Sequence, residues 1–277
     1  MIESSGNSQI KSITKLLKSR SERRKQDSYV VEGPKMVLEA ASFGMIRKVY
    51  IADSMWKALS EDDSAFLACS NRLPGHTAAE ALEAVTSYEY EIVADRIFED
   101  MSDTVTPQGI LAIAPMKLYE MSELPGIGND CRARWLMLEN VQDPGNLGTI
   151  IRTAEAAGFD AVLMNKGTVD IYNPKVVRAT MGAVFRMPFV YAGDICSIIN
   201  ECHSNGMTVA GASLAGKDIR NVIYPSRLAI IIGNESKGMT DEAEAMCDEL
   251  YKLPMYGQAE SLNASVAAGV LMYLSIL

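Results

Sequence analysis

Two uninterrupted apolar stretches limit the folds that this chain can adopt more than any other feature of its sequence. They are WLMLENV (135–141) and RLAIIIGNE (227–235). A strand with one face in water alternates apolar and polar residues, whereas a strand of a parallel sheet covered by helices on both faces is apolar throughout. Shorter apolar runs at 161–165 and 188–193 alternate with stretches of helical spacing. This pattern predicts an α/β domain over residues 134–277, built on a parallel sheet.

Further elements of this domain follow from the same spacing. We expect helices at 149–158, 173–185 and 194–205, a strand at 207–212, and a last helix from about Asn263.

The first 116 residues have a weaker form of the same alternation and predict a separate, small α/β domain. We expect helices at 8–25, 34–44 and 78–88 and strands at 28–33, 46–53 and 109–115. The segment between the domains, 117–133, contains two glycines, one proline and few apolar core residues. We interpret it as a linker with one helical turn.

Charge is distributed unevenly along the chain. The net charge of -9 would by itself argue against a polyanionic partner. Residues 1–25, however, contain seven lysines and arginines against two glutamates, a local charge of +5 that leaves -14 for the rest. A basic arm on an acidic body can contact RNA phosphates, and the alternative is a solvated helix face without a specific partner.

Neither a membrane nor an oxidising compartment is indicated. The N-terminus lacks the apolar core of a signal peptide, and the longest apolar run, 264–277, is too short to span a bilayer. The five cysteines are odd in number and form no C-x-x-C pair, which argues against a disulfide framework and a zinc ribbon. We therefore expect a soluble cytoplasmic protein.

Cys196, Cys202 and His203 lie close together in the sequence. The apolar spacing around them is typical of an amphipathic helix, so we favour packing over a metal site and predict no metal. Neither His203 nor the other histidine, His76, has a Ser, Cys or Asp in a recognisable nucleophile motif, which argues against a hydrolase triad.

The stretch GASLAGKD (211–218) differs by one residue from a phosphate-binding P-loop. Asp218 replaces the hydroxyl residue that would hold magnesium, and the chain reaches Pro225 without a helical pattern. No apolar strand ending in Asp follows, and a G-x-G-x-x-G fingerprint is absent. We therefore do not expect nucleotide hydrolysis.

Three loops rich in Gly, Asn and Ser each follow an apolar strand. They are ENVQDPGNLGTIIRTAEAAGF (139–159), IIIGNESKGM (230–239) and KLPMYGQAESLNASVAAGVLMYL (252–274). Glycines allow the backbone to approach a ligand closely, and ligands of parallel sheets bind at the carboxyl ends of the strands. Ser261 or Asn263 is expected to cap the last helix.

At these three loops the chain closely resembles the SpoU/TrmH family of RNA 2′-O-ribose methyltransferases, in the SPOUT superfamily. The resemblance covers most of 131–277, including NPKVVRATMGAVF (173–185). Residues 8–115 are similar, more weakly, to the ribosomal-protein-like substrate-binding domain of that family. The resemblance implies transfer of a methyl group from S-adenosyl-L-methionine (AdoMet) to a ribose 2′-hydroxyl by a homodimer. It also implies a deep trefoil knot in the C-terminal domain, which topology rules would have excluded.

The resemblance further assigns residues to the site. The residues implied for cofactor binding, largely through main-chain groups, are Ala212, Gly233, Asn234, Leu253 and Leu262. Core packing is the alternative for the two leucines. The residues implied for catalysis are Arg152, Asn146, Glu235, Ser261 and Asn263. Glu235 could orient Arg152 across the dimer, and Asn146 could fix the loop or the ribose. Purely structural roles remain the alternative, as turn or cap residues.

Arg152 is the residue that the resemblance makes responsible for activating the 2′-hydroxyl. Arginine stays protonated in proteins and is a poor general base. Our hypothesis is that Arg152, with a nearby RNA phosphate, orients the hydroxyl and stabilises the developing alkoxide. An ion pair on the helix surface with Glu155 or Glu235 is the alternative.

Basic side chains for contacts to RNA are predicted at Lys11, Lys15, Arg23, Arg24, Lys175 and Arg178. On an exposed helix such side chains are usually just solvated. Ribosomal RNA is favoured over transfer RNA as the substrate. An RNA-binding protein of the same fold without methyl transfer is the alternative function, and an enzyme that methylates a base nitrogen is another. The complete set of motif residues favours ribose methylation.

Overall fold

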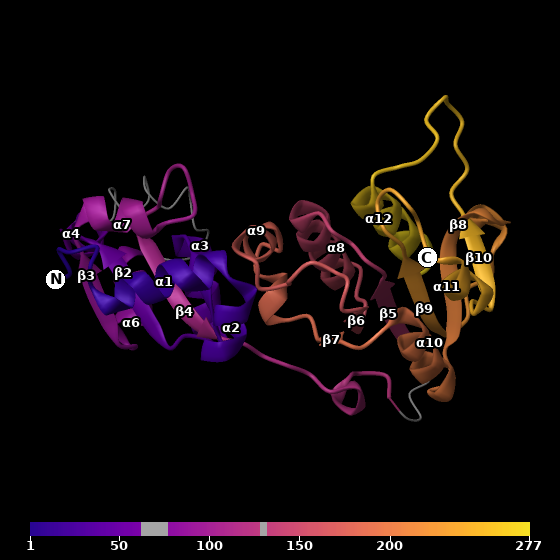
Figure 1. Cartoon of the computed structure of the whole chain (residues 1–277), viewed down its shortest axis with the longest axis horizontal. Coiled ribbons are helices and arrows are strands. Elements are labelled where there is room, and N and C mark those ends of the chain that lie inside the picture. Colours follow the sequence, from indigo (N-terminus) through magenta and orange to yellow (C-terminus); the bar gives the residue numbers. More distant parts are fainter. Residues whose placement is uncertain (62–76, 128–131) are drawn as a thin grey trace. The chain divides into compact units, whose positions relative to one another are not determined.

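The computed structural model describes residues 1–61, 77–127 and 132–277, so Cys69, His76 and Cys131 lie outside the described residues. The chain divides into two compact units (Figure 1). Unit 1 comprises Met1–Lys117 and Tyr172–Phe185, and unit 2 comprises Leu118–Ile171 and Arg186–Leu277.

Unit 2 is built on a parallel sheet whose strands lie in the order β10-β8-β9-β5-β6-β7. These strands are β5 (Ala133–Leu138), β6 (Ala161–Met164), β7 (Phe189–Tyr191), β8 (Thr208–Asp218), β9 (Arg227–Ile232) and β10 (Glu249–Lys252). Every residue of β5 and β6 is buried. The predicted α/β class and parallel sheet are therefore confirmed.

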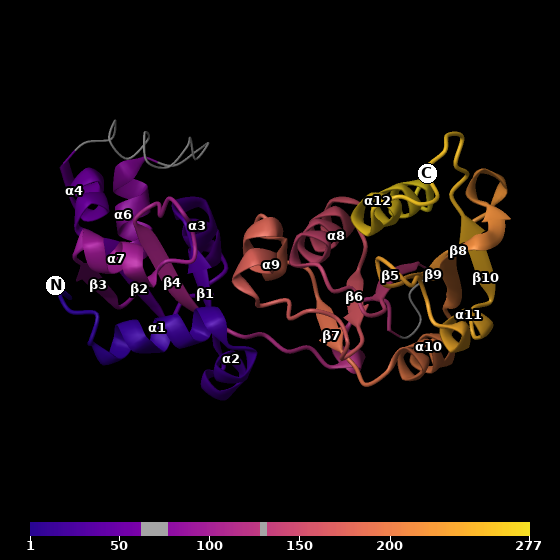
Figure 2. The ribbon, with the colours of Figure 1, turned by 45° about the horizontal axis from the view of Figure 1, so that its top comes forward.

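Helices cover both faces of this sheet (Figure 2). On one face lie α8 (Pro144–Ala156) and α12 (Ala264–Leu274), and on the other lie α10 (Ile195–Ser204) and α11 (Asp241–Ala245). Because side chains alternate along a strand, Trp135 and Met137 of β5 pack in the core on the α10 face, together with Cys202. Burial raises the pKa of the Cys202 thiol to about 12. Packing is thus the role of Cys202, as its helical spacing predicted.

Three details of unit 2 differ from the sequence prediction. α8 begins at Pro144, so DPGNLG forms its first turn, which Asp143 caps by accepting the N–H of Asn146. β8 continues to Asp218, so GASLAGKD is a strand rather than a loop. β10 and α11 were not predicted because segments of four and five residues are too short to show a period.

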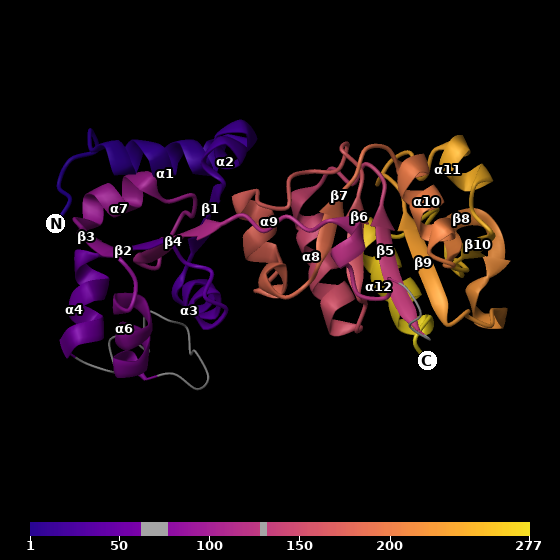
Figure 3. The ribbon, with the colours of Figure 1, turned by 90° about the horizontal axis from the view of Figure 1, so that it is seen from below.

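Unit 1 contains a sheet in the order β1-β4-β2-β3, with β2 and β3 parallel and the other neighbours antiparallel. Its strands are β1 (Ser28–Glu32), β2 (Lys48–Ala52), β3 (Tyr90–Val93) and β4 (Ile110–Pro115). One face carries α1 (Ser8–Lys18) and α7 (Asp95–Met101), and the other carries α3 (Pro34–Ser42), α4 (Asp53–Glu61) and α6 (Ala78–Thr86) (Figure 3). The small α/β domain is confirmed, although β3, α4 and α7 were not predicted.

The predicted helix over 8–25 is in fact two helices. Ser19 adopts an extended conformation (φ -129°) after α1 and caps α2 (Arg20–Gln26) by accepting the N–H of Glu22. The four apolar residues of α1 that set its helical spacing are all buried: Ile10, Ile13, Leu16 and Leu17. Across the part of the chain that the structure describes, every helix is too short or too polar to cross a membrane.

A segment from between β6 and β7 belongs to unit 1. The ring centroids of Tyr172 and Tyr29 lie 4.3 Å apart. Arg178 of α9 (Pro174–Ala179) donates to Asp103 at 2.9 Å. Sequence analysis assigned this segment to the C-terminal domain, because the chain between two strands of one sheet usually stays with that sheet. Its contacts instead group it with residues 1–117.

Candidate active site

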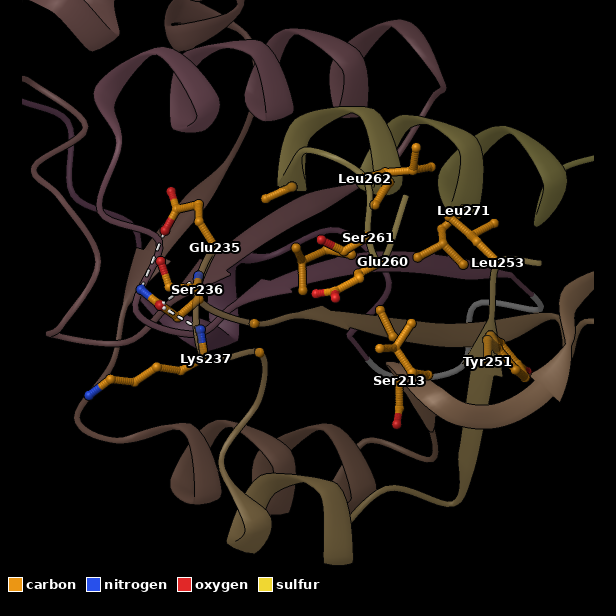
Figure 4. Close-up of a pocket in the computed structure, with 18 of the residues that line it drawn as sticks. Ser213, Glu235, Ser236, Lys237, Tyr251, Leu253, Glu260, Ser261, Leu262 and Leu271 are labelled. Carbon is orange, nitrogen blue, oxygen red and sulfur yellow. Dashed lines mark hydrogen bonds between the residues drawn. The ribbon is translucent and has the colours of Figure 1, made fainter. Parts of the chain in front are cut away.

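A cavity of about 360 Å³ lies at the carboxyl end of the unit 2 sheet. Its walls come from β8, from the loop after β9, and from the chain between β10 and α12. Figure 4 shows Glu235, Ser236 and Lys237 on one side, Leu253, Tyr251 and Leu271 on the other, and Glu260 and Ser261 between them. The cavity thus lies where sequence analysis expected a ligand, at the strand ends of a parallel sheet.

The structure brings together most of the predicted site residues. All five residues predicted to bind the cofactor line the cavity, and so do two of the predicted catalytic residues: Ala212, Gly233, Asn234, Leu253, Leu262, Glu235 and Ser261. Asn146 and Asn263 do not line the cavity but reach it through hydrogen bonds. Arg152 is the one predicted catalytic residue that lies outside this set.

Gly233 begins a tight turn after β9. The N–H of Asn234 donates to the carbonyl oxygen of Gly238 at 2.9 Å, and the N–H of Gly238 donates back at the same distance. A Cβ on Gly233 would lie 2.2 Å from the carbonyl carbon of Gly238. No side chain fits there, so glycine at this position allows the turn to close on the cavity.

Glu235 is held by a group of donors. Its carboxylate accepts the main-chain N–H groups of Gln142 (3.1 and 3.2 Å) and Asp143 (3.0 Å) and the amide of Asn146 (3.2 Å). Burial alone would raise the pKa of this carboxyl, but the hydrogen bonds from main-chain N–H groups and from Asn146 outweigh it and lower the pKa. Glu235 is therefore a charged anchor between β9 and the start of α8.

Asn146 and Asn263 connect the first and third loops. The Nδ2 of Asn263 donates to Oδ1 of Asn146 at 2.9 Å. Oδ1 of Asn263 accepts the N–H groups of Ser265 and Val266, so Asn263 is the cap of α12 and Ser261 is not. Hydrogen bonds thus join all three predicted loops through Glu235, Asn146 and Asn263.

Arg152 lies on an exposed face of α8, one and a half turns after Asn146. Within the described residues, neither a hydrogen bond nor an ion pair holds its guanidinium. The two carboxylates considered as partners are engaged elsewhere, since Glu155 accepts from Arg186 at 2.8 Å and Glu235 accepts main-chain N–H groups. The structure therefore gives no support to the surface ion pair and leaves the guanidinium accessible.

The lining of the cavity fits AdoMet. Its volume of about 360 Å³ falls in the usual range of small-molecule sites. Leu253, Leu262 and Leu271 provide apolar surface for a ring system, and the main chain of 233–238 provides polar groups. The carboxylate of Glu260 suits a ligand that carries positive charge. Sequence analysis missed Glu260 and Leu271, although Glu260 directly precedes SLN in the third loop.

No group of three His, Cys, Asp or Glu side chains in residues 1–61, 77–127 and 132–277 is arranged to hold a metal ion. His203, considered above as a metal ligand, pairs instead through Nε2 with the carboxylate of Asp248 at 3.0 Å.

The predicted RNA contacts divide into accessible and inaccessible side chains. Lys11, Lys15, Arg24 and Lys175 are exposed. Arg23 is only 3% exposed, and its Nη1 donates to the carbonyl oxygens of Leu16 (2.6 Å) and Leu17 (3.3 Å). It satisfies the last carbonyls of α1, which lack helical partners. This corrects the prediction for Arg23, which is not available to a phosphate. Arg178 is partly buried and already paired with Asp103.

Known proteins match both parts of the chain. Residues 133–273 match the family model described as the SpoU rRNA Methylase family, and residues 7–112 match the model described as an MRM3-like substrate binding domain. The 23S rRNA (guanosine(2553)-2′-O)-methyltransferase RlmP of Bacillus subtilis is 32% identical over 274 residues, which is 98% of this chain and 97% of that protein.

Solved structures agree with these matches. An AdoMet-bound rRNA methyltransferase from Sinorhizobium meliloti superposes with a TM-score of 0.81 at 26% identity, covering 99% of this chain and 96% of that one. The SpoU methyltransferase AviRb from Streptomyces viridochromogenes, in complex with AdoMet, has a TM-score of 0.80 at 21% identity over 98% of this chain and 97% of its own. This second likeness concerns the fold alone.

Proposed function

Because this chain belongs to the SpoU rRNA methylase family, we propose that it transfers the methyl group of AdoMet to a ribose 2′-hydroxyl of 23S ribosomal RNA. Its relative in Bacillus subtilis carries that activity in its name and matches the chain almost end to end. The choice of ribosomal over transfer RNA rests on this relative.

The observation that carries the proposal is the convergence of three distant segments on one cavity. Asn146 and Glu235 are 89 positions apart in the sequence, and Asn146 and Asn263 are 117 apart, yet their side chains form one hydrogen-bonded chain. Glu235 also lines the cavity that fits AdoMet. Plain core packing would not require such a polar chain at the rim of a cavity.

Bound AdoMet supplies an electrophilic methyl group on a positively charged sulfur. Leu253 and Leu262 and the main chain of 233–238 hold the cofactor, and Glu260 balances part of its charge. Methyl transfer from a sulfonium has a good leaving group. The main task of this chain is therefore to hold the hydroxyl in line with the methyl group, and positioning of this kind accounts for much of the rate.

We assign to Arg152 the orientation of the 2′-hydroxyl. Its exposed guanidinium can donate to the ribose oxygen and to an adjacent phosphate. Because it remains protonated, it stabilises the negative charge that develops on the oxygen and does not serve as the base.

We assign RNA binding chiefly to unit 1. Lys11, Lys15 and Lys18 are spaced four and three residues apart on α1, so they form one exposed basic face. Arg24 and Lys175 add exposed charge in the same unit. Such a face contacts phosphates without regard to sequence, so it adds affinity rather than choice of nucleotide.

We also propose that the active form is a cytoplasmic homodimer with a C-terminal knot, as the family resemblance implies. Support for the dimer comes from α12, where four apolar side chains with a spacing of four, three and four residues are exposed: Val266, Val270, Tyr273 and Leu277. A stripe of this kind suits burial against a second copy. Sedimentation of the purified chain tests this, with Val270→Asp expected to yield monomers; a wild-type monomer would contradict the assignment.

The decisive experiment is transfer of labelled methyl from AdoMet to 23S rRNA from a strain lacking this gene, followed by digestion to nucleosides. Wild-type protein, Arg152→Ala and the control Arg132→Ala are compared. Arg132 is also exposed but precedes β5, at the opposite end of the sheet from the cavity. We expect a 2′-O-methylated nucleoside that requires Arg152 and not Arg132. AdoMet binding without transfer would favour the RNA-binding alternative, and no AdoMet binding would refute the proposal.

A further inference from the structure

The main-chain amides that hold Glu235 belong to a loop with a left-handed residue. Asn140, which lies between β5 and α8, has a φ of 56°. Non-glycine residues rarely adopt this conformation, and those that do need support from their surroundings. The support for Asn140 comes from a single side chain, that of Asn165, which directly follows β6.

Asn165 and Asn140 form a reciprocal pair. Oδ1 of Asn165 accepts the main-chain N–H of Asn140 at 2.9 Å, and Nδ2 of Asn165 donates to Oδ1 of Asn140 at 3.0 Å. Asn165 is 7% exposed and is itself held by the hydroxyl of Thr168, which donates to its Oδ1 at 3.0 Å. A Cβ on Gly167 would lie 1.8 Å from Oδ1 of Asn140, so the Asn140 side chain is closely enclosed.

This pair acts on the second loop of the site. The carbonyl oxygen of Asn140 accepts Nδ2 of Asn234 at 2.8 Å. Oδ1 of Asn234 in turn accepts the N–H groups of Ser236 (3.0 Å) and Lys237 (3.1 Å) and so shapes the turn that lines the cavity. The direction of the Asn140 carbonyl therefore determines whether Asn234 can hold that turn.

The same loop also holds Glu235. Gln142 and Asp143, two and three residues after Asn140, direct their N–H groups at the Glu235 carboxylate. A change of the Asn140 backbone away from the left-handed region would rotate these donors as well. Both consecutive cavity residues, Asn234 and Glu235, thus depend on the conformation of Asn140.

We propose that Asn165 is a positioning residue of the methyl-transfer site, an inference that rests on the proposed function. It touches neither the cavity nor the cofactor-binding residues directly. Its amide selects the left-handed conformation of Asn140, and that conformation directs one carbonyl to Asn234 and two N–H groups to Glu235. Asn165 thereby preorganises the loop before AdoMet binds.

The sheet does not depend on this pair. β5 and β6 are joined over Trp135–Leu138 and Ala161–Met164 by their own ladder, and all of these residues are buried. Loss of the Asn165 amide should therefore loosen residues 139–146 without unfolding the strands before them.

The test compares wild type, Asn165→Ala and a control, Asn205→Ala, whose amide bonds Glu201 at the end of α10. Hydrogen–deuterium exchange of the peptide covering 139–146 is measured without ligand, and AdoMet affinity is measured by calorimetry. We expect faster exchange in that peptide, unchanged exchange in β5 and β9, and about a tenfold loss of AdoMet affinity for Asn165→Ala alone.

Repeating Asn165→Ala in an Asn140→Gly background separates positioning from general stabilisation. Glycine adopts positive φ without support, so the exchange and affinity effects of Asn165→Ala should be at least about threefold smaller there. Equal effects in both backgrounds, unchanged exchange at 139–146, or faster exchange throughout unit 2 would each overturn the proposal. Exchange is measured without RNA or cofactor, so these outcomes are independent of whether the wild-type chain methylates RNA.

Discussion

Replacing Glu235 by Gln should destabilise unit 2 in a pH-dependent manner. Glutamine has the same shape but keeps only one acceptor oxygen. In the wild type, Oε1 accepts from Gln142, Asp143 and Asn146, and Oε2 accepts from Gln142 and Asn234. With its oxygen at the Oε1 position, the introduced glutamine would direct its NH₂ group at the N–H of Gln142 and the amide of Asn234, which are both donors.

The magnitude follows from these contacts. The variant loses the negative charge that strengthens the hydrogen bonds at Oε1, and it loses the contacts at Oε2 outright. Hydrogen bonds to a charged group contribute about 1.5–3 kcal/mol to stability. Since Glu235 is only partly buried, we expect a loss near the lower end, about 2 kcal/mol at neutral pH.

The loss should depend on pH with a defined sign. The folded-state pKa of Glu235 is lowered relative to the unfolded chain, where it is about 4.3. Its ionised form therefore stabilises the fold fully above the unfolded pKa, and this contribution disappears as pH falls through the folded pKa. Wild type and Glu235→Gln should differ by about 2 kcal/mol at neutral pH and converge below about pH 3.

Urea unfolding followed by tryptophan fluorescence measures this difference. Trp135 is fully buried in unit 2, and replacing the only other tryptophan, Trp56 of unit 1, by Phe leaves a probe for unit 2 alone. Glu260→Gln is the matched control, because Glu260 lines the same cavity but is exposed. A difference that stays constant from neutral to acidic pH, or one equally large for Glu260→Gln, would refute the reasoning.

Three further predictions concern single residues with matched controls. Gly233→Ala should cost about 1–3 kcal/mol, because its Cβ meets the Gly238 backbone at 2.2 Å, whereas Gly257→Ala meets nothing within 4 Å and should be neutral by thermal unfolding. Arg23→Ala should destabilise unit 1 by about 1.5–3 kcal/mol, whereas exposed Arg24→Ala should not; equal effects by calorimetry would contradict the role of Arg23 at the end of α1. Changing Lys11, Lys15 and Lys18 together to Gln should weaken RNA binding and flatten its salt dependence by up to about 0.7 per lost contact. An unchanged slope in filter binding would remove the basic face from the RNA site.

Some parts of the fold and site could be predicted because the signal is local. The buried strands β5 and β9 are visible as apolar runs, since both faces of a parallel sheet are covered and no position remains polar. The cap of α12 at Asn263 is likewise local, because a cap is made by the residue directly before the helix. The cavity residues after β9 and before α12 could be named because they occur in long motifs that resemble a known family.

Other predictions failed where a residue depends on distant partners. Arg23 belongs to a basic stretch of sequence, and only the break at Ser19, which folds α2 back on the end of α1, buries its guanidinium against the last carbonyls of that helix. Residues 172–185 follow a strand of unit 2, but the stacking of Tyr172 on Tyr29 places them in unit 1. Neither partner is adjacent in sequence, so no local period records the contact.

The sequence by itself therefore determined the class of fold, the two-part organisation and the three segments that form the site. Only the tertiary structure decided how these segments are joined, through Glu235 with Asn146, Asn146 with Asn263, and Asn165 with Asn140. The physical reason is the range of the forces involved. Apolar burial imposes a period on neighbouring residues, whereas a hydrogen bond between side chains depends on two positions brought together only by the completed sheet.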